Sequence, residues 1–501
     1  MSLPTFDLSW SRLTELLSYD ASSPLIFSSG LFLFLFAAFM MFYGRLRNAP
    51  TARILYVVAF SLYFYYKSSG IYFLLLLFAS VSDFVLAQLI WRSRKGWAKR
   101  LWVALSVLVN LGMLGYFKYT DFLIEIANSL FGEGFLQFRN IFLPVGISFF
   151  VFQSMSYTID IYRGQLRPLD RWIDYCFYLS FFPQLVAGPI VRARDFIPQI
   201  RQNPLRITRE MFGTGVCLIL TGLFKKAVIS DYISLNFVDR IFDEPLLYSG
   251  FECLMGIYGY ALQIYCDFSG YSDMAIGIAL LMGFRFPKNF DAPYRSATIT
   301  EFWRRWHISL SSWLRDYLYI SLGGNRKGRM RTYGNLLLTM LLGGLWHGAA
   351  VRFILWGALH GAALALHKLW LAAVPGSKVL GCEMPWWRRL PGMLLTFHIV
   401  CFGWLLFRAE SMQTVGLMLH QIFRAFDPAL VPQVVEGYLP VFALLGLGYL
   451  LHALPDAADR RFRRAVVAAP MLVQVVMVAA VVWCVMQIKS SDIQPFIYFQ
   501  F

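Results

Sequence analysis

Hydrophobic residues along this 501-residue chain gather in long runs, and polar residues fall mainly in the short stretches between the runs. About twelve runs approach the roughly 20 residues that an α-helix needs to cross a bilayer. They lie near residues 25–43, 53–69, 71–91, 101–117, 140–160, 211–230, 252–283, 334–349, 351–372, 390–407, 436–453 and 466–486. A shorter apolar stretch, 174–188, is interrupted by Pro183 and Gly188 and is typical of a re-entrant segment. The pattern predicts an all-α, polytopic membrane protein with about 11–13 transmembrane or re-entrant helices.

Basic residues concentrate in alternate loops between these runs. The basic loops hold Arg45, Arg47 and Arg53; Arg92, Arg94, Lys95, Lys99 and Arg100; Arg192, Arg194, Arg201, Arg206 and Arg209; the stretch 285–331; Arg388 and Arg389; and Arg460, Arg461, Arg463 and Arg464. Loops 118–139 and 231–251 are poorer in bases. Because Lys and Arg favour the cytoplasmic side, we predict cytoplasmic basic loops and outward termini. Residues 1–24 then form an N-terminal extracytoplasmic segment, and residues 25–501 form a single membrane domain.

Composition agrees with a membrane protein. Hydrophobic residues make up 58% of the chain and charged residues 15%, whereas soluble domains have about 45–50% and about 25%. The net charge of +16 would favour nucleic-acid binding in a soluble protein. Here the basic residues follow the loops, so no nucleic-acid partner is expected. The seven cysteines are dispersed and form no CxxC pair, so neither a disulfide framework nor a metal site is expected.

The stretch 298–322 has the pattern of an amphipathic helix. Thr298 and Glu301 have the spacing of a capping box at its start. On a helical wheel, one arc of about 160° collects the apolar and aromatic residues, with arginines and serines opposite. This arc holds Phe302, Trp303, Trp306, His307, Leu310, Trp313, Leu314, Tyr317 and Leu318. The pattern predicts a helix at the cytoplasmic interface, in which His307 must hydrogen-bond inside the protein as a packing residue or a site residue.

A histidine also interrupts the apolar stretch 334–372, which has room for two short membrane helices. His347 lies in the sequence GGLWHG at residues 343–348. The glycines are expected to loosen the helix and to let another chain or a substrate approach the backbone closely. An ionisable residue at membrane depth indicates a functional site, with bonding between helices as the alternative. The later polar residues Arg352, His360 and His367 are interpreted as structural, with Arg352 at the outer end of the hairpin.

Two carboxylates, Asp267 and Asp273, form a second polar break within the apolar run 252–283. Carboxylates at membrane depth are costly unless they face water or a partner. The two aspartates therefore line a polar cavity, bind a cation, or cap the halves of a broken helix. The chain has no serine-hydrolase elbow, HExxH, P-loop or GxGxxG motif, which leaves histidine as the strongest acid–base candidate.

From about residue 25 to the end, the sequence resembles the membrane-bound O-acyltransferase (MBOAT) family. The motifs that carry the resemblance are LPVGISFFVFQSMSYTIDIYRG (143–164), FFPQLVAGPIVR (181–192), DFSGYSDMAIGIALLMGFRFPKNF (267–290), ITEFWRRWHISLSSWLRDYLYISLGGNRKG (299–328) and LLGGLWHGAAVRFILWGALHG (341–361). The family fold implies helices ringed around a central tunnel. The resemblance implies that His347 is catalytic and that His307, forty positions upstream, is a second catalytic residue. We expect Trp306, Trp346, Asp267 and Asp273 to line the tunnel or a cavity.

The same resemblance implies an O-acetyltransferase in the bacterial inner membrane. It would move an acetyl group from a cytoplasmic donor, acetyl-CoA, for modification of an exported polysaccharide such as alginate, cellulose or peptidoglycan. A periplasmic acetyltransferase partner would complete the transfer, and no bound cofactor is expected. One alternative is transfer of another acyl group, such as D-alanine. An alternative of another class is a proton-coupled transporter or flippase that uses His347, Asp267 and Asp273 as a proton relay.

Overall fold

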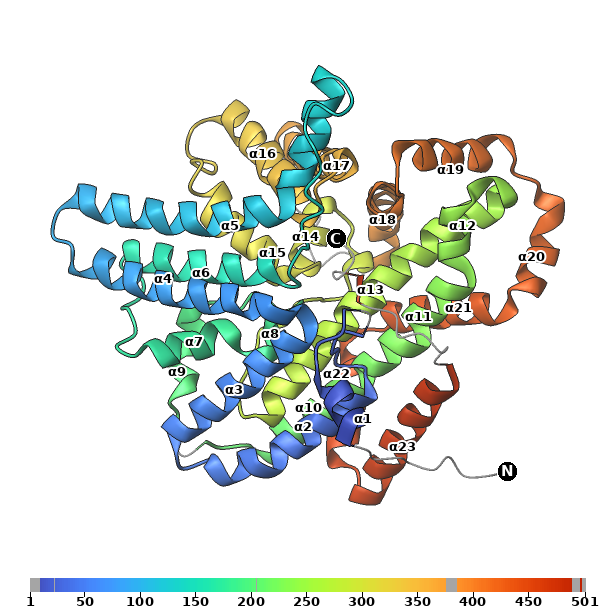
Figure 1. Ribbon diagram of the computed structural model, residues 1–501. Coiled ribbons are helices and arrows are strands. Elements are labelled where there is room, and N and C mark those ends of the chain that lie inside the picture. The colour runs from blue at the N-terminus through green and yellow to red at the C-terminus, as the bar shows by residue number, and fades with distance from the viewer. Residues whose placement is uncertain (1–9, 22, 204, 375–384, 489–495, 498–501) are drawn as a thin grey trace. The chain divides into compact units, whose positions relative to one another are not determined.

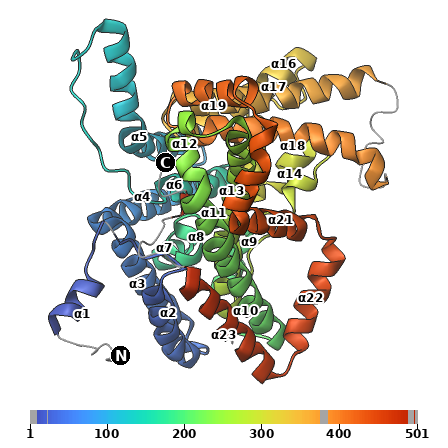
Figure 2. The ribbon, with the colours of Figure 1, turned by 90° about the vertical axis from the view of Figure 1, so that its right-hand side faces the viewer.

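The computed structural model describes residues 10–21, 23–203, 205–374, 385–488 and 496–497 (Figures 1 and 2). Within these residues all regular structure is helical. The chain divides into two compact units, which are described separately below. The first comprises residues 1–117, 140–187 and 192–206, and the second comprises residues 118–139, 188–191 and 207–501. The prediction of one membrane domain after residue 24 stays a prediction.

The first unit is built from helices that follow the apolar runs. Its elements are α1 (Trp10–Leu17), α2 (Gly30–Tyr43), η1 (Gly44–Leu46), α3 (Pro50–Ser69), η2 (Gly70–Tyr72), α4 (Phe73–Arg92), the start of α5 (Gly96–Phe131), α6 (Ile147–Tyr162), α7 (Trp172–Ser180), α8 (Phe182–Leu185) and α9 (Ala193–Ile200). A buried carboxylate, Asp83, ties α4 to its neighbours. It accepts hydrogen bonds from Ser106 Oγ at 2.5 Å and Asn110 Nδ2 at 2.6 Å, and a third from Ser154.

The second unit carries the two histidines singled out above. Its elements are the end of α5, then α10 (Arg209–Leu223), η3 (Phe224–Ser230), α11 (Asp231–Ile233), η4 (Ser234–Val238), α12 (Asp239–Asp243), η5 (Pro245–Leu247), α13 (Gly250–Leu281), η6 (Pro293–Arg295), α14 (Ile299–Arg305), α15 (Ile308–Trp313), η7 (Leu314–Tyr319), α16 (Arg329–His347), α17 (Val351–Ala373), α18 (Trp386–Arg408), α19 (Met412–Arg424), η9 (Pro428–Leu430), α20 (Val431–Gly437), α21 (Leu439–Ala453), α22 (Asp456–Ala468) and α23 (Met471–Ile488).

Each of the twelve predicted apolar runs contains a helix, which confirms the all-α class. By length and hydropathy, five of the described helical segments can cross a membrane, or seven if each bent pair counts as one span. They are Pro50–Arg92, Gly96–Phe131, Arg209–Asp243, Val351–Ala373 and Trp387–Arg408, with the bent pairs Pro428–Ala453 and Asp456–Trp483. The chain is thus a multi-pass membrane protein. The larger helix number, the sidedness of the loops and the central tunnel stay predictions.

Close backbone contact joins α10 to α13 in the second unit. A Cβ atom added at Gly222 would lie 2.5 Å from the Gly270 carbonyl oxygen, and one added at Gly277 would lie 2.6 Å from the Gly215 oxygen. These distances are shorter than a carbon–oxygen contact allows, so only glycine fits at the crossing. Small residues at matching positions are how membrane helices approach one another closely.

Two ion pairs join α13 to η3, the segment that follows α10, and they give the acidic residues of the run 252–283 their partners. Lys225 Nζ lies 2.6 Å from Asp273 Oδ2, and Lys226 Nζ lies 2.6 Å from Asp267 Oδ1. Lys226 also lies 2.8 Å from Asp231. Of the alternatives considered for the aspartates, the one in which they cap two halves of a broken helix was wrong, because α13 runs unbroken past both residues. Pairing with lysine is the lower-cost way to keep a carboxylate in an apolar environment.

Candidate active site

His347 is the last residue of α16, where this helix meets α17. The two helices form a tight hairpin (Figures 1 and 2), as the length of the run 334–372 predicted. A Cβ atom added at Gly344 would lie 2.1 Å from the Phe353 oxygen. The glycines therefore allow close backbone packing, and the expectation that they loosen the helix was wrong because α16 stays regular through Gly343 and Gly344. This packing fixes the helix end that carries the His347 side chain, which is 5% exposed.

His307 lies at a sharp break between α14 and α15. Its backbone φ of 42° is left-handed, and Trp306 before it is extended. The prediction of one continuous amphipathic helix was therefore wrong, because a helical wheel assumes regular backbone at every position. Left-handed backbone is uncommon and costly for residues other than glycine, and it persists only where the surroundings fix it. The residues of the predicted apolar arc are buried inside the protein, apart from the half-buried Leu318.

The start of this segment only partly matches the predicted capping box. The Thr298 side chain accepts a hydrogen bond from the Glu301 backbone N–H at 3.1 Å, as predicted. The Glu301 carboxylate instead accepts from Ala297 N and pairs with Arg305 and Arg389 at 3.1 and 2.7 Å. The carboxylate thus ties the segment to α18 as well as to its own helix start.

Asn289 holds the left-handed turn at His307 in place. Its backbone oxygen accepts from Ile308 N at 2.9 Å. Its side-chain Oδ1 accepts from Ser309 Oγ at 2.9 Å and lies 3.3 Å from His307 Nδ1. Ser309 Oγ also lies 3.4 Å from Nδ1. Because an amide oxygen only accepts hydrogen bonds, the shorter contact with Asn289 favours the tautomer of His307 with its proton on Nδ1. In that tautomer the lone pair of the neutral ring is on Nε2.

Burial determines the protonation state of His307. The side chain is 0% exposed, and burial lowers its pKa from 6.5 to about 3. The imidazole therefore stays neutral at physiological pH. A neutral ring with Nδ1 protonated can accept a hydrogen bond from a substrate hydroxyl through Nε2, but it is a weak base. His307 suits an orienting role.

Aromatic rings surround the two histidines and bring them together. The Trp346 ring centre lies 4.9 Å from that of His347 and 6.4 Å from that of His307. Trp356 and Phe407 pack on His347 at 5.0 and 5.3 Å. The predicted pair thus forms one water-poor, apolar cluster, in which electrostatic contacts are stronger than in water.

Two residues that the sequence did not reveal bind the carbonyl end of α16. Lys118 Nζ donates to Trp346 O at 2.7 Å and to His347 O at 3.0 Å. Tyr119 OH donates to Leu345 O at 2.8 Å. Helix ends leave carbonyl oxygens without intrahelical partners, and these two side chains supply donors for three of them. Lys118 and Tyr119 therefore fix the end of α16 that carries His347.

The other predicted residues lie in different surroundings. Trp306 is buried and packs on Phe290 and Trp404, with ring centres 5.0 and 4.8 Å away. The lining roles of Trp306, Trp346, Asp267 and Asp273 stay predictions. Arg352 begins the hairpin's second helix and donates to Phe407 O at 2.7 Å and Ala409 O at 2.6 Å, which caps α18. Among the described residues, no group of three or more His, Cys, Asp or Glu side chains is placed to hold a metal ion.

Comparison with known proteins identifies a protein family and several relatives that the chain is similar to. The family model for MBOAT, the membrane-bound O-acyltransferase family, matches residues 60–381, a range that includes both histidines. The probable alginate O-acetylase AlgI of Pseudomonas putida is 38% identical over 95% of this chain and 100% of that protein. The peptidoglycan O-acetyltransferase of Helicobacter pylori is 36% identical over 78% of each chain. The teichoic acid D-alanyltransferase of Bacillus subtilis is 31% identical over 54% of this chain and 70% of that protein.

The family match confirms the resemblance seen in the sequence, and it makes the chain an enzyme that transfers acyl groups. The same match favours an acyltransferase over the alternative of a transporter or flippase. The chain belongs to the membrane-bound O-acyltransferase family.

Proposed function

We propose that this enzyme transfers an acetyl group from acetyl-CoA on the cytoplasmic side of the bacterial inner membrane for O-acetylation of an exported polysaccharide. The alginate O-acetylase and peptidoglycan O-acetyltransferase relatives support both the acetyl group and a polymeric acceptor. The observation that carries the proposal is the buried pair His307 and His347, which meet at the Trp346 ring. The polymer that finally carries the acetyl ester is alginate or one like it, with cellulose and peptidoglycan as the other members of the proposed class. The hydroxyl that receives the acetyl group at His347 belongs to an earlier acceptor, from which the group passes to the polymer.

His347 carries the chemistry in this proposal by one of two routes. As a general base it takes the proton of the acceptor hydroxyl while that oxygen attacks the acetyl carbonyl carbon. The carbon–sulfur bond then breaks, and the leaving thiolate receives the proton back from His347. As a nucleophile, a ring nitrogen first takes the acetyl group and releases the thiol, and the acceptor hydroxyl then removes the acetyl group. Both routes end in an acetyl ester and a free thiol.

His307 and Lys118 support this reaction in different ways. The lone pair on Nε2 of His307 accepts a hydrogen bond from the acceptor hydroxyl and orients it. Lys118 does not touch the reacting atoms and is a positioning residue, because it binds the backbone of His347. Fixing the reacting groups before the reaction lowers the barrier. We assign the final transfer to polymer to a periplasmic acetyltransferase partner.

The experiment is acetyl transfer by purified enzyme in vesicles. Acetyl-CoA labelled on the acetyl group is supplied from the side of the basic loops, and label in an acetyl ester of a saccharide acceptor is measured. The expected result is labelled ester from the wild type and none from a variant that lacks His347. If a rapid quench traps label on the enzyme itself, the nucleophilic route is selected. Transfer of D-alanine is the second candidate, favoured by the teichoic acid D-alanyltransferase relative. If label is transferred from a labelled D-alanyl carrier and not from acetyl-CoA, the transferred group is D-alanine and not acetate.

A further inference from the structure

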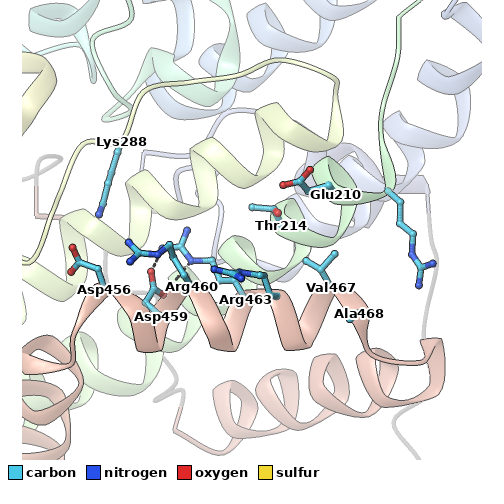
Figure 3. A pocket seen from close by; sticks show the side chains of 11 residues that line it. Glu210, Thr214, Lys288, Asp456, Asp459, Arg460, Arg463, Val467 and Ala468 are labelled. Carbon is cyan, nitrogen blue, oxygen red and sulfur yellow. Dashed lines mark hydrogen bonds and ion pairs between the residues drawn. The ribbon is translucent and has the colours of Figure 1, made fainter.

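A cavity lies in the second unit, away from the two histidines, between the start of α10 and helix α22. It has a volume of about 820 Å³, within the range of small-molecule sites. Figure 3 shows Lys288 reaching from its loop toward α22, with Asp459, Arg460 and Arg463 on the facing part of that helix. The lining residues are Arg209, Glu210, Thr214, Lys288, Asp456, Asp459, Arg460, Arg463, Arg464, Val467 and Ala468.

The charges in this cavity are unbalanced in favour of the cations. Two of its three carboxylates already have partners, because Asp459 pairs with Arg463 and Asp456 pairs with Arg295 at 2.8 Å. The three other arginines have no ion-pair partner within the part of the chain that the structure describes. They are Arg209, Arg460 and Arg464. Unpaired arginines that share one cavity repel each other and attract anions.

The arginines come from loops far apart in the sequence. Arg209 ends one basic loop, Lys288 belongs to another, and the α22 arginines form a third. All three loops are predicted to face the cytoplasm. The cavity wall is fixed by packing, because a Cβ atom added at Gly213 of α10 would lie 3.0 Å from Val467 of α22.

The helix α22 also has the character of an interfacial helix. Four arginines lie along it, and the apolar helix α23 follows after a bend of 120°. A basic helix that leads directly into an apolar one lies where phosphate groups of lipids are concentrated. Arginine is the side chain that best matches phosphate oxygens, because its planar guanidinium forms two parallel hydrogen bonds.

We propose that this cavity is a phosphate-binding site at the cytoplasmic face, with Arg209, Arg460 and Arg464 as its main ligands. The phosphate has two sources, the headgroup of an anionic phospholipid or the phosphates of a soluble nucleotide-type donor. Binding needs no acetyl transfer, so the site is tested separately from the proposed function. Each arginine that binds phosphate through paired, charged hydrogen bonds contributes about tenfold to the affinity.

The experiment measures binding to the full-length protein in two arms. In the first, nanodiscs of phosphatidylcholine are compared with nanodiscs that contain phosphatidylglycerol, and bound lipid is counted by native mass spectrometry. In the second, coenzyme A is titrated into protein in phosphatidylcholine nanodiscs. The test variant is R460Q/R464Q, and the matched control is R461Q, which removes an arginine from the same helix outside the cavity. Both are also made in an H347A background, which removes catalysis and leaves the cavity intact.

The proposal expects specific binding in at least one arm, weakened at least about tenfold in R460Q/R464Q and unchanged in R461Q. Binding in the lipid arm assigns the phosphate to a headgroup, and binding in the coenzyme A arm assigns it to the donor. The three changed arginines are exposed, so each arginine variant is expected to keep the melting temperature of its own background, wild type or H347A. Absence of binding in both arms, or equal weakening by R461Q, would overturn the proposal.

Discussion

Replacing Lys118 tests whether the carbonyl end of α16 positions His347. The K118M variant keeps a long apolar stem and loses the ammonium group, which donates to Trp346 O and His347 O at 2.7 and 3.0 Å. Each buried carbonyl left without its donor costs about 1–3 kcal/mol. If about 3 kcal/mol is lost from the transition state, kcat falls about 100-fold.

The assay is transfer of labelled acetyl groups by protein in vesicles, with the concentration of the donor varied. Because Lys118 acts through His347, kcat should fall while KM for the donor stays within about twofold. K118R keeps a cation with several donors, so it should recover activity to within about tenfold of wild type. Y119F removes one neutral hydrogen bond of 2.8 Å to Leu345 O, worth about 1 kcal/mol or about fivefold in kcat.

Thermal unfolding in detergent separates positioning from general damage. A purely structural role would lower the melting temperature of K118M and leave kcat per folded molecule unchanged. The reasoning is refuted if folded K118M has wild-type kcat, or if K118R is as inactive as K118M while Y119F is unaffected.

The remaining predictions concern the turn at His307 and the packing of the second unit. H307N should fold well because asparagine tolerates left-handed backbone, whereas H307A should be less stable by about 1 kcal/mol. Both variants should lose at least about tenfold in kcat. Melting curves measure the stability of the two variants, and kinetics measures their kcat. Burial lowers the pKa of His307 from 6.5 to about 3, so between pH 6.5 and pH 3 only the unfolded chain gains a proton at this residue. The stability of the wild type should therefore fall as the pH drops through this range. The melting temperature of H307N should fall less steeply over the same range. G222A should lower the free energy of unfolding by at least about 2 kcal/mol, since its Cβ would lie 2.5 Å from a backbone oxygen of α13. G416A has nothing within 4 Å of the added Cβ and should raise the free energy of unfolding by about 0.5–1 kcal/mol. Chemical denaturation measures both values. D267N should lower the melting temperature more than D273N, because the Asp267 side chain is 4% exposed and that of Asp273 is 21% exposed.

The hydrophobic pattern was sufficient to predict the helices but not their local breaks. Every apolar run contains a helix because burying backbone polar groups in lipid requires one. The break at Trp306 and His307 could not be read from periodicity, since it depends on hydrogen bonds to Asn289, which is distant in sequence. The glycines of GGLWHG indicated an unusual backbone in this stretch. Their actual effect is close packing against α17, and the hydrophobic pattern does not show where α17 lies.

The candidate site was predicted in part for a similar reason. The resemblance identified His307 and His347, and the fold brings both to the Trp346 ring. Lys118 contacts a residue 229 positions away, so no local pattern could indicate its role. A signal did exist for Lys225 and Lys226: two lysines inside an apolar run require acidic partners, and Asp267 and Asp273 are the acidic residues in the neighbouring run.

The central claim is that His347 is the residue that performs acyl transfer in this enzyme. The most direct measurement compares H347A with wild type and with H420A, which removes an exposed histidine on α19, in vesicles supplied with labelled acetyl-CoA. We predict that H347A loses at least about 1,000-fold in acetyl transfer per folded molecule, while H420A keeps wild-type activity. Acetyl transfer at the wild-type rate by folded H347A would contradict the account.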